Sequence, residues 1–407
     1  MQEIKTKIQD TRNKKIRRYV IIPYCILFLV SCLPAEQAGI FSPMRRILGN
    51  VALSLVVFAL MFLLAEMAWR FAVSSGDMQR QYDPRVGLVN PPHAEWTVRA
   101  PEFVTRMRTN ALGFRGQELT PRVDPAEVRI LFLGDSFVEE KPVAEEDRFI
   151  EQTAQLLAED LGRPVTARAL AVGGANPGRE LLFYREYGRA WEPDVVVQVL
   201  FLENDLFTAS GSFSFRADAS GALELTDIKP EPLPPCPFKC QLLRRSELLL
   251  QIYRIVRGRG SDEGKPNLGD LVGYTVEGQK QYETEQRFDV LRALVQALWQ
   301  DVEQDGALFV AVLMPAGFEM EEEWRKEIQE GFRAVVPPDG WRLSWLLDKG
   351  ETVLESAGIR VLDLRSAIAA HTREDQHLYL RINGHLNAVG SRAVAEELRT
   401  YLRGLPL

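Results

Sequence analysis

A serine at position 136 follows an apolar run that ends in Gly134-Asp135-Ser136. The run, residues 128–133, has the composition of a buried strand, so it delivers the serine to a loop at the strand's end. Gly134 permits a tight turn there and a close approach of backbone to a ligand. Loops after the carboxyl ends of parallel strands are where α/β sheets place their chemistry. Because Gly-Asp-Ser is also ordinary turn composition, the tripeptide needs partners elsewhere in the chain.

Three further polar stretches follow in order. They are Ala-Val-Gly-Gly-Ala at 171–175, Phe-Leu-Glu-Asn-Asp at 201–205 and Asn-Gly-His-Leu-Asn at 383–387. Each lies just after an expected strand or before the last expected helix, so all can meet Ser136 at one edge of the sheet. A serine hydroxyl needs a base within hydrogen-bond reach, and His385 is the histidine placed to accept its proton and return it to a leaving alkoxide.

These four blocks together resemble the SGNH hydrolases, also called GDSL esterases, over about residues 126–404. The resemblance implies that Ser136 is the nucleophile and His385 the general base and acid. It also implies an oxyanion hole made by the backbone N–H groups of Ser136 and Gly174 and by the side-chain amide of Asn204. Asp135 is expected to hold the loop backbone and support the serine. The stretch Thr-Asn-Ala-Leu-Gly-Phe-Arg-Gly at 109–116 is similar to membrane-anchored bacterial members.

The acid that usually precedes the histidine in this family is missing, because Asn383 and Ile382 occupy its positions. An asparagine carbonyl can accept from the ring Nδ1–H but carries no charge. In serine proteases an Asp-to-Asn change at the equivalent place lowers turnover by about 10⁴. Three outcomes are open: a slow enzyme oriented by Asn383, a carboxylate recruited from Asp375 or Asp363, or a Ser-His dyad.

Two more departures concern the surroundings of the nucleophile. The glycine that commonly precedes the block-three asparagine is absent, with Leu202 and Glu203 in its place. Glu139 and Glu140 follow the serine where smaller or apolar residues are usual, and we expect them to put negative charge at the mouth of the site.

The elements expected around these blocks alternate as in an α/β domain. Strands are predicted at 128–133, 165–170, 194–200, 307–313 and 359–364, and helices at 146–161, 180–191, 277–305 and 388–402. Five strands joined by crossover helices predict a three-layer α/β/α fold around a mostly parallel five-stranded sheet. By resemblance this is the SGNH, flavodoxin-like architecture.

The chain divides into four expected parts: a leader at 1–43, a transmembrane anchor at 44–73, a juxtamembrane spacer docked on the catalytic domain at 74–125, and that domain at 126–407. The domain carries insertions at 207–277 and 314–340. In the first insertion, Cys236 and Cys240 are expected to form a disulfide. The arginine-rich run at 241–259 is expected to form an amphipathic helix that packs on the domain, caps the cleft, or contacts headgroups or an acidic glycan. The second insertion is expected at the cleft rim.

An uncharged run at 47–65 is long enough, as a helix, to cross the hydrocarbon core of a bilayer. Arg45 and Arg46 precede it, so the positive-inside rule places the following domain outside the cytoplasm. We therefore expect a bacterial inner-membrane protein whose domain faces the periplasm or the exterior. The earlier run at 19–35 has three interpretations: a first span, a lipoprotein signal, or sequence translated upstream of a start at Met44.

Composition narrows the function classes. The formal net charge is −7, which argues against a nucleic-acid partner. His93, His371 and His377 lack the spacing of metal ligands, so no metal or other cofactor is predicted. The leading hypothesis is an esterase acting on an acyl ester, with an O-acetyl group of a cell-envelope glycan as the candidate substrate. The alternatives are an O-acyltransferase using the same site and a non-catalytic glycan-binding or scaffold subunit. The oligomeric state is not predicted.

Overall fold

The computed structural model describes residues 43–72, 80–206, 212–217, 222–230, 246, 248–249, 271–372 and 376–407. The chain forms two compact units, Met1–Met67 and Ala68–Leu407. The leader at 1–42, the expected Cys236–Cys240 disulfide and Asp375 lie outside the described residues, as does almost all of the run 241–259.

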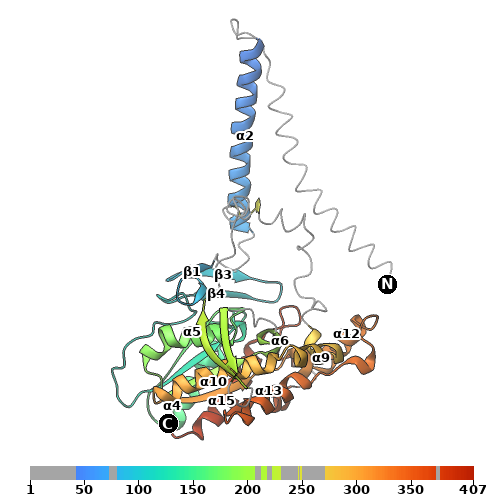
Figure 1. Ribbon diagram of the computed structural model, residues 1–407. Helices are drawn as coiled ribbons and strands as arrows, with labels where there is room; N and C mark the ends of the chain where they lie inside the picture. The colour runs from blue at the N-terminus through green and yellow to red at the C-terminus, as the bar shows by residue number, and fades with distance from the viewer. Residues whose placement is uncertain are drawn as a thin grey trace. The chain divides into compact units, whose positions relative to one another are not determined.

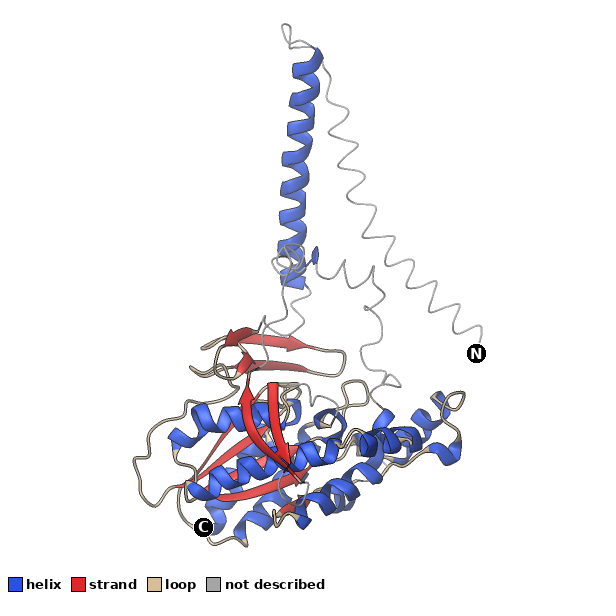
Figure 2. Cartoon of the chain, in the orientation of Figure 1, coloured by secondary structure: helices blue, strands red, loops and turns tan. Residues whose placement is uncertain are grey.

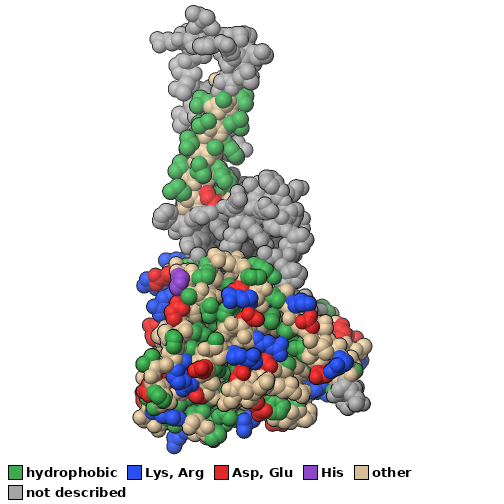
Figure 3. Space-filling model, turned by 60° about the vertical axis from the view of Figure 1, so that its left-hand side comes forward, with side chains coloured by type: hydrophobic (Ala, Val, Ile, Leu, Met, Phe, Trp, Pro, Cys, Tyr) green, Lys and Arg blue, Asp and Glu red, His purple; other side chains and the backbone are tan. Residues whose placement is uncertain are grey.

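The described residues of the first unit all belong to helix α2 (Pro43–Ala72), whose last five residues are counted in the second unit. Its segment Asn50–Ala68 has a mean hydropathy of 2.4, and within the described residues it alone is long and apolar enough to cross a membrane. The predicted span at 47–65 falls in this helix. Its apolar side chains face outward in Figure 3, and Phe58 is 67% exposed. The length, apolar composition and exposed side chains of this segment suit a helix in contact with lipid.

The second unit is built on one parallel sheet with the strand order β11-β10-β7-β5-β6. Its strands are β5 (Val128–Gly134), β6 (Val165–Ala171), β7 (Val195–Leu200), β10 (Leu308–Leu313) and β11 (Val361–Asp363). All five predicted strands are confirmed. Every residue of β5 and β7 is buried, which explains why these strands are continuous apolar runs.

Helices cover both faces of this sheet, as Figure 2 shows, and the predicted three-layer α/β/α fold is confirmed. Alternate residues of β5 enter two separate cores, because successive side chains of a strand point to opposite faces. Leu131 and Leu133 pack in the core beneath α5 (Pro177–Phe183), α10 (Arg287–Gln304) and α13 (Trp345–Ser356). Ile130 and Phe132 pack in the core beneath α4 (Phe149–Leu161), α14 (Arg365–His371) and α15 (Ala388–Arg403).

Two helices differ from their predicted extents. The run at 277–305 is divided into α9 (Val276–Thr284) and α10, because Gln286 between them adopts a left-handed conformation with φ of 52°. The run at 180–191 begins earlier, where Asn176 caps Pro177 and accepts from the Arg179 N–H. It then loosens into a π-turn over Tyr184–Gly188 and a 3-10 turn over Arg189–Trp191.

The segment before the sheet, expected as a docked spacer, forms two small antiparallel hairpins (Figure 1). They are β1 (Gln81–Asp83) with β2 (Gly87–Val89), and β3 (Glu95–Arg99) with β4 (Val104–Arg108). Val86 and Phe114 belong to the domain core, where the Phe114 ring lies 5.0 Å from that of Phe183. In the turn after β4, Asn110 Oδ1 accepts from the N–H groups of Leu112 and Phe114. The segment therefore contributes to the hydrophobic core of the second unit.

The remaining elements are short. They are α3 (Ser136–Glu139), α6 (Leu202–Asp205), the hairpin β8 (Ser212–Ala217) and β9 (Leu223–Lys229), α11 (Gly317–Met320), α12 (Glu322–Gly331), and 3-10 turns at Glu145–Asp147, Val272–Tyr274 and Pro338–Gly340. On the face shown in Figure 3, basic and acidic side chains are interspersed over the domain surface. The helices α3, α6 and α11 all begin at carboxyl ends of sheet strands, which is the edge that carries the polar blocks.

Candidate active site

Ser136 is the first residue of α3, directly after β5. Asp135 caps this helix, and its Oδ1 accepts from the Phe137 N–H at 2.9 Å. Gly134 is required by packing, because a Cβ at this position would lie 2.4 Å from Val138 Cγ2 and 3.2 Å from the Val199 carbonyl oxygen. The β5 strand, the glycine and the aspartate cap together fix where the serine emerges.

His385 lies on the loop before α15 and reaches Ser136 from 249 residues away, with Nε2 2.8 Å from the serine Oγ. Its Nδ1 lies 2.9 Å from Asn383 Oδ1 and 3.1 Å from the Asn383 carbonyl oxygen. A backbone carbonyl can only accept, so Nδ1 carries the proton and Nε2 is left to accept from the Ser136 hydroxyl. This is the tautomer that a general base requires.

Burial lowers the pKa of His385 from its ordinary value, and the nearby Asp135 carboxylate and the Asn383 carbonyl act in the opposite direction. The imidazole is therefore neutral at pH 7 and ready to accept a proton. The ring also packs against Phe137, with centroids 4.7 Å apart, which holds its plane in place.

Asn383 takes the place of the missing acid. Of the two carboxylates considered as replacements, Asp363 bonds the Arg365 backbone and guanidinium instead, and Asp375 lies outside the described residues. Within the part of the chain that the structure describes, no carboxylate hydrogen-bonds to the ring of His385. The geometry is thus a Ser136-His385-Asn383 chain of hydrogen bonds.

Replacing Asn383 with aspartate is expected to raise turnover about tenfold, because a charge-assisted bond stabilises the imidazolium that forms in the transition state. The negative charge also raises the pKa of His385, because it stabilises the charged form of the ring. Only the neutral ring acts as base, so the acid limb of the kcat/KM profile should move to higher pH. The pH profile of ester hydrolysis measures both effects. Asn383→Ala is the control and should show lower turnover without that upward shift; an unmoved limb in Asn383→Asp would contradict the assignment.

Asn204 lies in α6, the short helix after β7. Its Nδ2 donates to Asp135 Oδ2 at 2.6 Å, so one aspartate holds both the serine turn and the asparagine. The bond uses one of the two amide hydrogens. Asn204 lines the same cavity as Ser136 and His385, which is where an oxyanion donor has to lie.

The glycine pair of the second block lies against the nucleophile, since a Cβ at Gly173 would be 3.4 Å from Ser136 Cβ. The Gly173 N–H donates to Glu139 Oε2 at 2.8 Å. Gly174, exposed and in a left-handed conformation with φ of 74°, has open space beside it. Because the Gly173 N–H is already engaged, Gly174 remains the candidate oxyanion donor of this loop.

The expectation that Glu139 and Glu140 charge the mouth of the site is wrong, because both are buried, at 0% and 2% exposure. Helix α3 turns Glu139 inward, where it accepts from Asn90 Nδ2 at 2.9 Å as well as from Gly173. Glu140 accepts from Ser391 Oγ at 2.7 Å, and burial raises its pKa to about 8. Through these hydrogen bonds the two buried glutamates hold the segments around the serine in place.

Behind the serine lie three buried carboxyl groups that the sequence analysis did not single out as a group: Asp135, Glu180 and Asp205. Burial raises the pKa of each, that of Glu180 to about 8. Glu180 accepts from Gln198 Nε2 at 2.7 Å. Among the described residues, no group of three or more His, Cys, Asp or Glu side chains is arranged to hold a metal ion. Burial thus favours the neutral form of each of these three carboxyl groups.

The cavity above Ser136 has a volume of about 320 Å³. Besides the serine and histidine blocks, its walls come from Phe201, from Phe318 and Trp324 of the segment expected at the rim, and from Arg381. The Arg381 guanidinium lies 5.3 Å from the centroid of the Trp324 ring. One side of the cleft is thus apolar and aromatic, with a cation at its edge.

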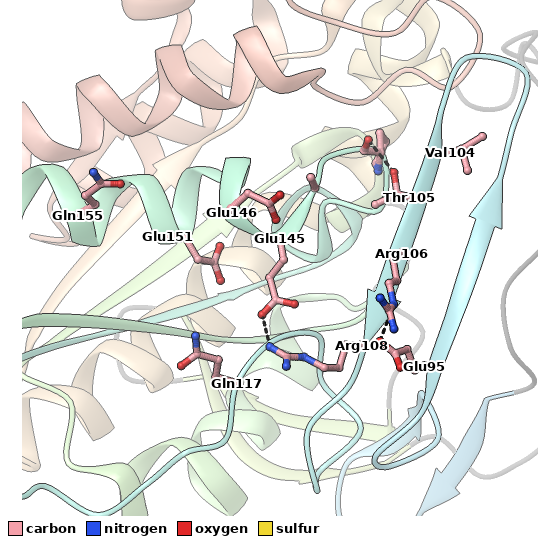
Figure 4. Close-up of a pocket in the computed structure, with 12 residues that line it drawn as sticks. Glu95, Val104, Thr105, Arg106, Arg108, Gln117, Glu145, Glu146, Glu151 and Gln155 are labelled. Carbon is pink, nitrogen blue, oxygen red and sulfur yellow. Dashed lines mark hydrogen bonds and ion pairs between the residues drawn. The ribbon is translucent and has the colours of Figure 1, made fainter.

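A larger cavity, of about 1060 Å³, lies elsewhere, between the β3–β4 hairpin and the start of α4 (Figure 4). Two ion pairs lie in its lining, Arg108–Glu145 at 2.8 Å and Arg106–Glu95 at 2.6 Å. It contains neither the serine nor the histidine. The chemistry therefore belongs to the smaller cavity.

No protein-family model matches the sequence, and no curated protein matches it either. Among solved structures, the chain is similar to a lipase from a goat rumen metagenome, with 14% identity, coverage of 68% of this chain and 97% of that chain, and a TM-score of 0.38. An acetyl xylan esterase has 15% identity, coverage of 68% and 100%, and a TM-score of 0.34. A lipase/acylhydrolase from Enterococcus faecalis has 13% identity, coverage of 68% and 96%, and a TM-score of 0.34. At these low values, the functional inference rests on the chain's own geometry.

Proposed function

We propose that this chain is an SGNH-type serine esterase. The observation that carries the proposal is the hydrogen bond of 2.8 Å between Ser136 Oγ and His385 Nε2, with the opposite ring nitrogen bonded to Asn383. This arrangement makes the serine a nucleophile and the neutral histidine its base. A non-catalytic scaffold subunit, the alternative class, has no need for that alignment.

The reaction proceeds in two halves. His385 Nε2 takes the Ser136 proton while Oγ bonds the acyl carbon, and the carbonyl oxygen becomes an oxyanion facing the backbone N–H groups of Ser136 and Gly174 and the Asn204 amide. Collapse breaks the ester C–O bond, and the imidazolium returns its proton to the departing alkoxide. Water then attacks the acyl-serine with the same base, releasing the carboxylic acid and restoring the serine.

The substrate we propose is an O-acetyl group on a cell-envelope glycan. A cavity of about 320 Å³ beside the serine has room for a small acyl group, and Trp324 offers a flat apolar face to a sugar. Arg381 beside it is held by Glu321 at 3.2 Å and Glu327 at 3.1 Å. The uncharged run at 47–65, preceded by Arg45 and Arg46, supports anchoring in the inner membrane with the domain on the periplasmic side. Analysis of the products distinguishes hydrolysis from transfer to a sugar hydroxyl.

The proposal is tested by covalent labelling of the full-length protein with a fluorophosphonate, which traps an activated serine. Wild type and Ser356→Ala, a control at the end of α13, should label to one equivalent, whereas Ser136→Ala should not label at all. Folding of each variant is checked by its urea midpoint. Labelling that persists in Ser136→Ala would refute the assignment. So would a folded wild type that stays unlabelled while a known serine esterase reacts in the same tube.

A further inference from the structure

In the loop that carries His385, backbone carbonyls satisfy only some of the backbone N–H groups. Leu380 donates its N–H to the His385 carbonyl at 2.8 Å and accepts from the Gly384 N–H at 2.8 Å, which closes a turn. The N–H groups of Ile382 and Asn383, in the part of the chain that the structure describes, donate to no backbone carbonyl. Both instead donate to one carboxylate, that of Glu102.

Glu102 comes from the tip of the β3–β4 hairpin, 281 residues from Asn383 in the sequence. Its Oε1 and Oε2 each lie 3.0 Å from the Ile382 nitrogen, and Oε2 lies 2.8 Å from the Asn383 nitrogen. Bonds from N–H groups to an ionised carboxylate are about twice as strong as bonds between neutral groups. The contact therefore fixes the backbone of the residue that orients the catalytic ring.

The hairpin is built to hold this side chain in place. Strands β3 and β4 pair in register from Glu95↔Arg108 to Arg99↔Val104, so the tip is a tight connection. The Ala100 N–H donates to the Phe103 carbonyl at 2.9 Å across it. Pro101 restricts the turn by fixing φ. On β4, Thr105 Oγ1 donates to the Pro142 carbonyl at 3.0 Å, which ties the hairpin to the loop after α3.

We propose that Glu102 is a positioning residue for the catalytic histidine, a role that rests on the proposed esterase function. The family's usual aspartate both hydrogen-bonds to the imidazole and stabilises its charged form, whereas Asn383 can only hydrogen-bond to it. Placement of Asn383 therefore depends on the loop backbone, and Glu102 supplies that placement from outside the sheet. The hairpin is accordingly a part of the active site, with its carboxylate acting through Asn383.

Glu102→Ala is expected to lower the second-order rate of fluorophosphonate labelling about 10- to 100-fold, because small misplacements of a catalytic group carry costs of this size. Glu102→Gln keeps one acceptor oxygen and should fall between wild type and the alanine variant. Glu95→Ala is the matched control: it removes an exposed carboxylate from the same hairpin, one that pairs with Arg106, and should label at the wild-type rate. All variants are compared as full-length protein with their urea midpoints.

A double-mutant cycle separates positioning from general support. If Glu102 acts through Asn383, then Glu102→Ala should cost little in an Asn383→Ala background, because the two effects share one pathway. Additive losses in this cycle, an unchanged labelling rate in Glu102→Ala, or an equal loss in Glu95→Ala would each overturn the proposal.

Hydrogen exchange tests the contact without any need for activity. The amides of Ile382 and Asn383 should be protected in wild type and in Glu95→Ala, and should exchange faster in Glu102→Ala. Unchanged protection in Glu102→Ala would overturn the positioning role even in an active enzyme. A wild type that exchanges as expected but never labels would refute the esterase function, and with it the positioning role, although the contact of Glu102 with the two amides would stand.

Discussion

Replacing Asn204 with alanine is expected to lower kcat about 100- to 1000-fold, the usual cost of losing one oxyanion donor. The amide is held by Asp135 at 2.6 Å on a short helix directly after β7, in the wall of the cavity that contains Ser136. A donor aimed in advance stabilises the oxyanion without reorganising in the transition state. Because this charge is absent from the bound ester, KM should change little while kcat and kcat/KM fall together.

Steady-state hydrolysis of p-nitrophenyl acetate by the full-length protein measures this loss. Truncating Asn204 also removes a hydrogen-bond donor from buried Asp135, so the urea midpoint of the variant is measured in parallel. Asp135 Oδ1 still accepts from the Phe137 N–H in the variant, which keeps the serine turn in place. A variant that folds normally and keeps kcat within tenfold of wild type would contradict the assignment of Asn204. The oxyanion hole would then consist of the backbone N–H groups of Ser136 and Gly174.

The sheet could be predicted because its signal is local. Strands β5 and β7 are buried along their whole length and therefore appear as unbroken apolar runs. Once the strands are parallel, their carboxyl ends share an edge, so the residues after them come together however far apart they are in sequence. That rule predicts that Ser136, after β5, and Asn204, after β7, lie together, and both line one cavity. His385 follows no strand; its place before the last helix and the family resemblance predicted that it joins them, and it lines the same cavity.

The supporting contacts could not be predicted because they depend on tertiary placement. Charge after a nucleophile suggests an exposed rim, yet Glu139 and Glu140 are buried, since partners such as Asn90 and Ser391 come from distant segments. Glu102 looks like an ordinary hairpin-tip residue until the turn at Ile382 is seen beside it. Sequence patterns indicate which face of a helix or strand is buried. They do not indicate which distant loop will contact that face.

Replacing Arg115 with methionine is expected to destabilise the domain by about 3 to 5 kcal/mol, because it removes buried hydrogen bonds from a charged donor to three backbone carbonyls. Arg115 is 2% exposed and donates to the carbonyl oxygens of Glu139 at 3.0 Å, of Val143 at 2.6 Å, and of Glu140. Burial, with Arg148 nearby, lowers its pKa to about 10, so it stays charged at neutral pH. Methionine fills similar space but removes the Arg115 donor from the Glu139 and Val143 carbonyls, and each buried acceptor left unpaired costs about 1 to 3 kcal/mol. The Glu140 carbonyl still accepts from the Val143 N–H at 3.1 Å.

Urea unfolding of the full-length protein measures the loss, with Arg106→Met as the matched control. Arg106 lies on β4 with its side chain 75% exposed, and its ion pair with Glu95 is at the surface, so the control should change stability by less than about 1 kcal/mol. The carbonyls that Arg115 holds lie at the end of α3 and in the loop after it, so the variant should also label more slowly at urea concentrations well below its midpoint. Equal stability of the two variants would show that the cost of desolvating the buried arginine offsets the free energy of its hydrogen bonds, and would contradict the predicted destabilisation.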